Sequence, residues 1–345
     1  MTFTYETLIR VRNRSAMNDD TRNQAKRLLV TSGVARLDRR HLEQFSEAGF
    51  ELDLRYELSG IRDEETLVDA LDGAWGVIAG TEHYTRAVLE RSPGLRVIAR
   101  CGVGYDAIDV DAADDLGTVV TTTPGANDES VAEFAVALAV ALLGRAAPAR
   151  RLADETVAVI GLGAIGMGVA RRFAGFGSRV LGVDPWADPA ACRAEGIELT
   201  GMPAALAAAG VISLHVPLSS ATAGLIGAEQ LALMPPDSLL VNTARGEIVD
   251  EGALLDALRS GSIGGAALDV FLDEPLPPGH PIREVSSTIL TGHIAGMTQA
   301  SVMAMLDDTL AHLLRIRAGM LPRRGVVNRR LPAKGAPSAT TTADL

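Results

Sequence analysis

The sequence predicts an α/β protein with two doubly wound parallel-sheet domains. Short apolar segments alternate with helical patterns along most of the 345 residues, and this alternation is typical of parallel strands joined by crossover helices. Several of the segments are apolar from end to end, as expected of strands that helices cover on both faces. Hydrophobic residues make up 47% of the chain, which is enough for two buried cores of ordinary domain size.

The first series of elements is expected between residues 26 and 123. KRLLVTSG, which begins at Lys26, is interpreted as a strand that ends at a turn glycine. The segments that follow predict strands in 75–80, 95–100 and 117–123, and helices in 67–74 and 85–93. Residues 1–25 are expected to form a polar, flexible leader, because they lack the apolar stretch of a signal peptide.

A long helix is expected next, beginning near Asn127 or Asp128, and either side chain is suited to cap it. From Phe134 to Leu143 every residue is apolar. A helix without a polar face is buried on all sides. We therefore expect its own domain or a second subunit to cover it.

The second series runs from Thr156 to about Gly296. Its β-rich segments predict strands in 156–163, 178–185, 210–217, 238–246, 264–270 and 287–294, with helices in 167–177 and 252–261. A further helix is expected in 301–319. The tail at 331–345, rich in Pro, Ala and Thr, is expected to be disordered.

The strongest local motif is Gly161-Leu-Gly163-Ala-Ile-Gly166, between a predicted strand and a predicted helix. In Rossmann-like domains such glycines permit a tight turn and a close approach of the backbone to a pyrophosphate. Asp184 ends the next strand, 23 residues after Gly161 (184 − 161). Its carboxylate suits the adenosine ribose hydroxyls and would repel the extra phosphate of NADP, so we predict NAD. The alternative is a plain glycine turn with a surface aspartate.

Arg245, Glu274 and His293 each fall near the C-terminal end of a predicted strand, where open α/β sheets bind ligands. The arginine can form paired hydrogen bonds with the carboxylate and carbonyl oxygens of a 2-oxo acid. The histidine can donate a proton while the carbonyl carbon accepts a hydride. The glutamate can hydrogen-bond the other imidazole nitrogen and favour the imidazolium. Each residue also has a structural alternative. Arg245 could be a surface charge, Glu274 a turn acid before Pro275, and His293 a strand-end histidine whose hydrogen bonds are satisfied within the protein.

These residues lie within strings that resemble the D-isomer-specific 2-hydroxyacid dehydrogenases, most closely their phosphoglycerate dehydrogenase branch. The resemblance covers roughly Lys26 to Asn328. The strings are RCGVGYDAID, TTTPGANDESVAEF, VIGLGAIG, HVPLSSATAGLI, LLVNTARGEIVDEGALLDALRSG, GAALDVFLDEPLP and TGHIAG.

The resemblance implies a role for each matching position. It implies that Arg245, Glu274 and His293 are the catalytic residues, with His293 as acid and base. The implied cofactor contacts are Gly161, Gly163, Ala164, Ile165, Gly166, Asp184, Val216, Thr243, Ala244, Asp269 and Gly296. The implied substrate contacts are Val103, Gly104, Asn127 and Arg245. It also implies a substrate domain of 26–125 and 298–330, with the NAD-binding domain, 126–297, inserted into it.

The chain departs from the family pattern in three places. Ala79-Gly80-Thr81-Glu82 stands where many phosphoglycerate dehydrogenases have Arg-Ser-x-Thr, so an arginine that would meet a phosphate is missing. The added Glu82 carboxylate is expected to repel a dianion unless His83, Arg86 or a neighbouring chain compensates. The segment 144–155 is shorter than usual, which affects the expected dimer interface. Gly292 replaces the proline that usually precedes the histidine.

Composition narrows the function classes further. A net charge of −11 disfavours nucleic acid or an anionic membrane as a partner. Two cysteines give no disulfide framework and fit the cytoplasm. We therefore expect an NAD-dependent oxidoreductase for a small 2-hydroxy or 2-oxo acid, a homodimer without a metal. The alternatives are a corepressor-like or an inactive dinucleotide-binding scaffold protein.

Overall fold

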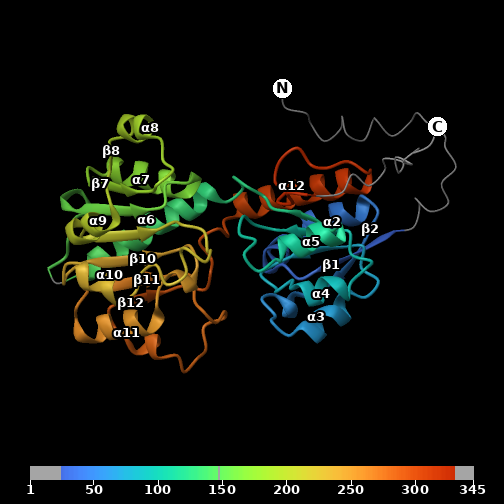
Figure 1. Ribbon diagram of the computed structural model, residues 1–345, viewed down its shortest axis with the longest axis horizontal. Coiled ribbons are helices and arrows are strands. Elements are labelled where there is room, and N and C mark those ends of the chain that lie inside the picture. Colours follow the sequence, from blue (N-terminus) through green and yellow to red (C-terminus); the bar gives the residue numbers. More distant parts are fainter. Residues whose placement is uncertain (1–24, 147, 331–345) are drawn as a thin grey trace, which may run out of the picture.

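The computed structural model describes residues 25–146 and 148–330. They form two lobes, each built around a parallel sheet (Figure 1). The predicted leader, except for Ala25, and the predicted tail lie outside the described residues. Within the described ranges, no helix is both long enough and apolar enough to cross a membrane.

The first lobe contains a five-stranded sheet in the order β2-β1-β3-β4-β5. Its strands are β1 (Lys26–Val30), β2 (Phe50–Leu54), β3 (Gly76–Ala79), β4 (Val97–Arg100) and β5 (Val119–Thr121). The helices between them are α2 (Arg39–Glu47), α3 (Glu64–Leu71), α4 (Arg86–Glu90) and α5 (Val110–Leu116). Every strand pair is parallel, so all the C-terminal strand ends meet at one edge of the sheet.

The second lobe contains a seven-stranded parallel sheet in the order β12-β11-β10-β9-β6-β7-β8. Its strands are β6 (Thr156–Ile160), β7 (Arg179–Val183), β8 (Ile197–Leu199), β9 (Val211–Leu214), β10 (Leu239–Asn242), β11 (Gly265–Leu268) and β12 (Thr288–Leu290). Its helices are α6 (Asp128–Arg145), α7 (Ala164–Gly175), α8 (Pro189–Ala194), α9 (Met202–Ala208), α10 (Ala228–Leu233) and α11 (Glu251–Ser260). The strand order reverses direction beside β6, the position at which doubly wound sheets bind dinucleotides.

The chain returns to the first lobe at its C-terminal helix, α12 (Gln299–Arg317). Buried Met305, Leu306 and Leu313 of α12 share a core cluster with Leu28 and Phe45 of the first lobe. The predicted order of two parallel-sheet domains, with the second placed inside the first, is therefore the observed fold. The exact boundaries 26–125, 126–297 and 298–330 remain a proposal.

Helix α6 begins at Asp128, at the predicted place, but the predicted side-chain cap is wrong. Asn127 is the N-cap residue and makes no capping hydrogen bond. Its φ of −124° and ψ of 4° depart from the extended conformation in which N-cap side chains usually reach the first turn. Its amide instead abuts Gly296, where an added Cβ would lie 2.7 Å from Nδ2.

The chain itself buries only part of the apolar helix α6. Ala135, Leu138 and Leu142 are buried against the second sheet and α7. The opposite face, which holds Ala137, Val140, Ala141 and Gly144, is exposed, and Val140 is 45% accessible. An apolar helix face in contact with water is unfavourable, and the chain alone therefore does not supply the burial expected on all sides.

Candidate active site

The predicted glycine turn is built as a close approach of three backbone segments. Gly161 has a φ of 91°, and a Cβ there would lie 2.6 Å from the His215 carbonyl oxygen. A Cβ on Gly166 would lie 1.9 Å from the Gly161 carbonyl oxygen. Neither position tolerates a side chain. Gly163, by contrast, is the N-cap of α7 and has nothing within 4 Å of its Cβ position, so the end of a 12-residue helix is open to a phosphate.

Asp184 directly follows β7 and ties its own loop to the glycine turn. Its Oδ2 accepts a hydrogen bond from the Leu162 amide at 2.8 Å, and its Oδ1 accepts one from the Trp186 amide at 2.8 Å. The carboxylate is half-buried and keeps further lone pairs free for ribose hydroxyls. The residues present therefore fit a dinucleotide.

The remaining predicted cofactor contacts line the same region. Val216 lies against the glycine turn, 2.9 Å from the Gly161 Cβ position. Thr243 precedes the half-buried Ala244, and its Oγ1 is buried without a hydrogen-bond partner. A buried hydroxyl of this kind is suited to hydrogen-bond a ligand. Ala164, Ile165 and Gly166 form the first turn of α7.

Asp269 has a clear structural role in addition to its predicted one. It is fully buried, and its carboxylate accepts hydrogen bonds from Thr291 Oγ1, the Ile294 amide and the Ala295 amide at 2.6, 2.9 and 2.9 Å. Its carbonyl oxygen accepts a fourth bond, from the His293 amide at 2.7 Å. Asp269 thus fixes the loop that carries His293, and its contact with a nicotinamide remains a prediction.

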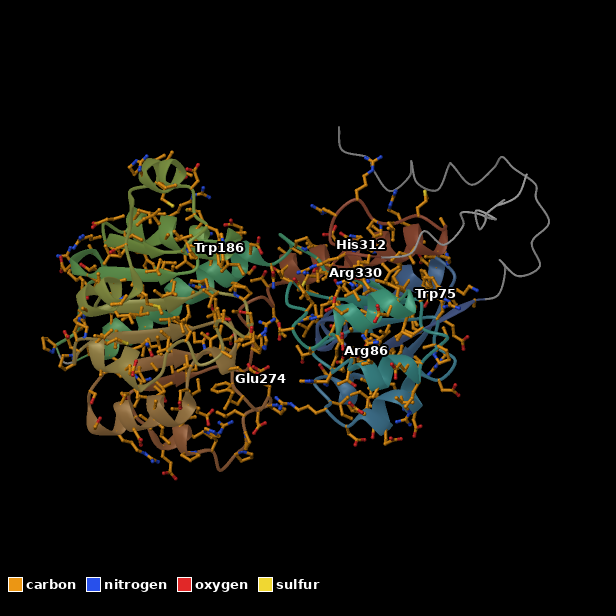
Figure 2. All side chains as sticks on the ribbon, in the orientation of Figure 1. Trp75, Arg86, Trp186, Glu274, His312 and Arg330 are labelled. Carbon is orange, nitrogen blue, oxygen red and sulfur yellow. The ribbon has the colours of Figure 1, made fainter. Side chains whose placement is uncertain are left out.

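His293 and Glu274 form a close pair, with Nδ1 and Oε2 2.7 Å apart. Oε1 of Glu274 accepts a hydrogen bond from the Phe271 amide at 3.0 Å. Burial alone would raise the pKa of Glu274, but its hydrogen bond to His293 and the charge of His293 hold that pKa below its usual value. Glu274 therefore stays ionised, and His293 Nε2 is the ring nitrogen left for another partner. Figure 2 places Glu274 on the side of its lobe that faces the other lobe.

His293 is the only non-glycine residue with a positive φ, 56°, in the described part of the chain. The left-handed region is costly for a residue with a Cβ and persists only where neighbouring contacts enforce it. The four bonds to Asp269 supply those contacts. Such enforced geometry is typical of functional sites.

Arg245 completes the predicted trio but is paired with a residue that the sequence analysis did not select. Its Nε donates to both carboxylate oxygens of Asp106 at 3.0 and 3.2 Å, and its Nη2 lies 3.0 Å from Oδ1. Nη1 donates to the Ala244 carbonyl oxygen at 2.6 Å. A Cβ on Gly104 would lie 1.5 Å from Nη2, so the glycine loop of the first lobe lies directly against the guanidinium. Val103, beside it, is half-buried.

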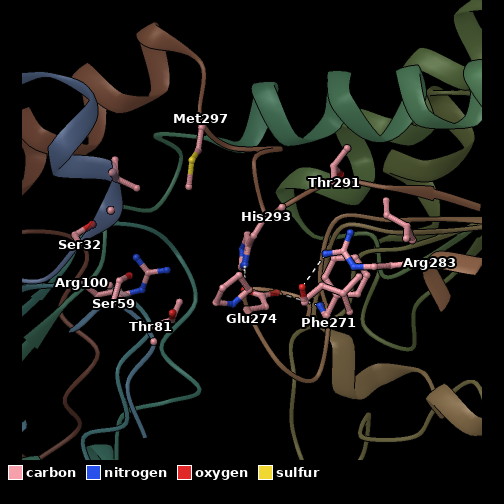
Figure 3. A pocket seen from close by; sticks show the side chains of 18 residues that line it. Ser32, Ser59, Thr81, Arg100, Phe271, Glu274, Arg283, Thr291, His293 and Met297 are labelled. Carbon is pink, nitrogen blue, oxygen red and sulfur yellow. Dashed lines mark hydrogen bonds and ion pairs between the residues drawn. The ribbon is translucent and has the colours of Figure 1, made fainter. Parts of the chain in front are cut away.

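The two lobes enclose the trio within two adjoining cavities of about 460 and 130 Å³. The smaller cavity is lined by Asp106, Arg245, Glu274 and His293. The larger runs from Glu274 and His293 to Ser32, Ser59, Thr81 and Arg100 of the first lobe. Figure 3 shows Arg100, Ser59 and Thr81 on one side and the Glu274–His293 pair on the other.

Arg100 is the second residue that the sequence analysis missed. Burial, and then the charge of Arg245, lower its pKa, and its guanidinium faces the larger cavity. The signal was present, because Arg100 ends β4 and the strand-end argument that selected Arg245 applies equally to it.

The expected repulsion of a phosphate by Glu82 is wrong. Glu82 is fully buried, and its Oε2 accepts hydrogen bonds from the Gly80 amide at 2.9 Å and from the Tyr84 hydroxyl at 3.2 Å. Burial raises its pKa. The side chain lies beneath the cavity wall rather than within the cavity, so it presents no charge to a ligand there.

Comparison with known proteins agrees with this geometry. Residues 141–295 match the family model described as the NAD-binding domain of the D-isomer specific 2-hydroxyacid dehydrogenases. A glyoxylate reductase from Korarchaeum cryptofilum is 34% identical over 305 residues, which are 80% of this chain and 89% of that protein. A D-3-phosphoglycerate dehydrogenase from Methanocaldococcus jannaschii is 36% identical over 78% of this chain, which spans only 54% of that longer protein.

Solved structures give the same result for the whole fold. The TT0316 protein from Thermus thermophilus has a TM-score of 0.77 at 32% identity, with 87% of this chain and 99% of that chain covered. The D-lactate dehydrogenase from Aquifex aeolicus, solved with NAD and lactic acid, has a TM-score of 0.73 at 27% identity, with 85% and 96% covered. Both lobes and their connections are therefore similar to those of known dehydrogenases.

Proposed function

The chain belongs to the D-isomer-specific 2-hydroxyacid dehydrogenase family, and on that basis we propose that it transfers a hydride between NAD(H) and C2 of a small 2-hydroxy or 2-oxo acid. The observation that carries the proposal is the convergence of Arg245, Glu274 and His293 on one cavity between the lobes. The nicotinamide, when bound, supplies the hydride. The three side chains supply orientation and the proton.

In the direction of reduction, Arg245 binds the acid and polarises its carbonyl oxygen. His293 donates a proton from Nε2 to that oxygen as the carbon accepts the hydride. Glu274, ionised and 2.7 Å from Nδ1, holds the ring in position and stabilises the imidazolium before the transfer. In oxidation the neutral imidazole accepts the proton, so Glu274 and His293 serve both directions. Backbone groups of Val103 and Gly104 complete the carboxylate site.

We further propose that the substituent on C2 of the 2-oxo acid is small and uncharged, a hydrogen or a hydroxymethyl group, rather than one that carries a phosphate. Relatives carry the names of both glyoxylate reductase and phosphoglycerate dehydrogenase. Ala79 and Gly80 supply no cation, while the larger cavity offers the hydroxyls of Ser32, Ser59 and Thr81. Arg100 supplies the charge on the first-lobe wall, while Arg283, which also lines this cavity, donates to the Pro277 and Leu276 carbonyl oxygens at 2.9 and 2.7 Å. The hydroxyl-rich lining favours glyoxylate or hydroxypyruvate over phosphohydroxypyruvate.

The test is NADH oxidation with glyoxylate, hydroxypyruvate, pyruvate, phosphohydroxypyruvate and 2-oxoglutarate, each with the wild-type chain and with His293→Ala. We expect turnover of at least one small acid and its loss in the variant. If NADH binds by fluorescence titration but no acid is reduced, the corepressor-like or scaffold alternative is supported. Phosphohydroxypyruvate as the best substrate would contradict only the proposed substituent on C2.

The assembly and location of the protein are also proposals. The exposed apolar face of α6 favours a homodimer formed through the cofactor-binding lobe. Both cysteines, Cys101 and Cys192, are buried as free thiols, which favours the reducing environment of the cytoplasm.

A further inference from the structure

The guanidinium of Arg245 faces a carboxylate of the protein on one of its two edges, and its Nη1 also donates to the Ala244 carbonyl oxygen at 2.6 Å. The Nε–Nη2 edge faces Asp106, with contacts of 3.0, 3.2 and 3.0 Å. A guanidinium has two edges that can form paired hydrogen bonds with a carboxylate. Asp106 therefore already occupies, on one edge, the position that a ligand carboxylate would otherwise take.

The pair joins the two lobes. Asp106 follows the glycine loop after β4 in the first lobe, whereas Arg245 follows β10 in the second. Both side chains are partly buried, with 27% of the Asp106 side chain and 22% of the Arg245 side chain accessible. Burial alone would raise the pKa of Asp106, but the charge and hydrogen bonds of Arg245 hold it below the usual value. Asp106 is thus ionised, and its charge cancels that of Arg245 inside the cavity where the substrate is expected.

We propose that Asp106 is a specificity-determining residue: it neutralises Arg245 and fixes its guanidinium at the cavity, so that the site prefers a monoanionic acid to a dianionic one. The inference rests on the proposed function and names its substrate class by charge. A second negative group on a bound acid would be repelled by the Asp106 carboxylate, which contacts the same guanidinium. Without that carboxylate, the full charge of Arg245 would favour the dianion.

The charge effect can be separated from the loss of orientation by a matched pair of ligands. Oxamate and oxalate have nearly the same size and shape, but oxamate carries one negative charge and oxalate carries two. Any disorder of Arg245 weakens both ligands in a similar way. The ratio of their dissociation constants therefore reports the charge that the site presents.

The experiment is calorimetric titration of oxamate and oxalate into the protein saturated with NADH, for the wild type, Asp106→Asn, Asp106→Glu and Asp111→Asn. Asp111 is exposed, with 75% of its side chain accessible, and controls for the change in net charge. We expect the preference for oxalate over oxamate to rise about tenfold in Asp106→Asn, as for one charge several ångströms away in a partly exposed cavity. It should stay within about twofold of wild type in Asp106→Glu and Asp111→Asn, since only Asp106→Asn removes a charge beside Arg245.

An unchanged ratio in Asp106→Asn, an equal change in Asp111→Asn, or no binding of either ligand to the wild type would overturn the proposal. Circular dichroism checks that each variant is folded, and Asp106→Glu retains the charge if the shape of the asparagine is not tolerated. Binding needs no turnover. A wild type that binds oxamate but reduces no acid would therefore contradict the proposed function while the ratio still tests Asp106.

Discussion

His215 packs against the glycine turn, and its burial predicts how the stability of the protein depends on pH. Its amide donates to the Ile160 carbonyl at 2.7 Å, its carbonyl oxygen lies against Gly161, and its Nε2 lies 2.7 Å from Ser213 Oγ. Burial lowers its pKa from 6.5 to about 3. The imidazole is therefore neutral in the folded protein at any pH at which enzymes are usually assayed.

The sign of the effect follows from proton linkage. Between pH 6.5 and 3 the unfolded chain binds a proton at His215 that the folded chain does not, so the free energy of unfolding falls as pH falls through this window. With these two pKa values, the loss between pH 7 and pH 5 is about 2 kcal/mol. Glutamine at this position is neutral throughout and can still hydrogen-bond Ser213, so His215→Gln removes this contribution.

The assay is urea unfolding of wild type and His215→Gln at pH 7, 6 and 5, with NADH affinity measured at each pH. We expect the stability of the wild type to fall by about 2 kcal/mol more than that of the variant, while NADH affinity shows no such difference because the imidazole of the folded protein stays neutral. His83→Gln, the same change at a half-buried histidine, should behave like wild type. Equal pH dependence of wild type and His215→Gln would refute the argument.

Three further predictions concern function. His293→Ala should lower kcat by about 10²–10⁴-fold with NADH affinity retained, whereas Arg245→Ala should also raise KM. A His293→Ala variant with an unaltered rate would show that the proton comes from elsewhere. NADH should be preferred to NADPH because of the Asp184 carboxylate, and steady-state kinetics with equal or better kcat/KM for NADPH would contradict this. Light scattering should give a dimer for wild type and a monomer for Val140→Glu, because the introduced carboxylate lies on the exposed apolar face of α6. A monomeric wild type at micromolar concentration would exclude the proposed interface.

The central strands were predictable because their apolar runs are covered on both faces. The missed strands, β2 and β8, are the outer strands of their sheets. FELDL and IEL include exposed Glu51, Leu54 and Glu198, so they lack the continuous apolar run that marks a central strand. The short helices α8, α9 and α10 have 6, 7 and 6 residues, too few to show a clear helical period.

The sequence predicted Arg245, Glu274 and His293 and the pairing of the last two, but not the pairing of Arg245 with Asp106. The position of Arg245 after a strand predicts that it faces the cleft, whereas its partner Asp106 lies 139 residues earlier, in the other lobe. No local pattern encodes a contact that depends on how two lobes meet. The same reason explains Glu82, whose sequence position beside the cavity does not show that its side chain turns into the core.

Gly292 shows how a departure from the family pattern is compensated at a distance. A glycine before His293 would be expected to loosen the loop, since it restricts the backbone less than the usual proline. The loop is instead held by Asp269, which is fully buried and accepts three bonds through its carboxylate and one through its carbonyl oxygen. Because those bonds reach residues on both sides of the histidine, they fix its left-handed backbone without help from residue 292. The rigidity that a proton donor needs therefore comes from the end of β11, where the sequence predicted only a cofactor contact.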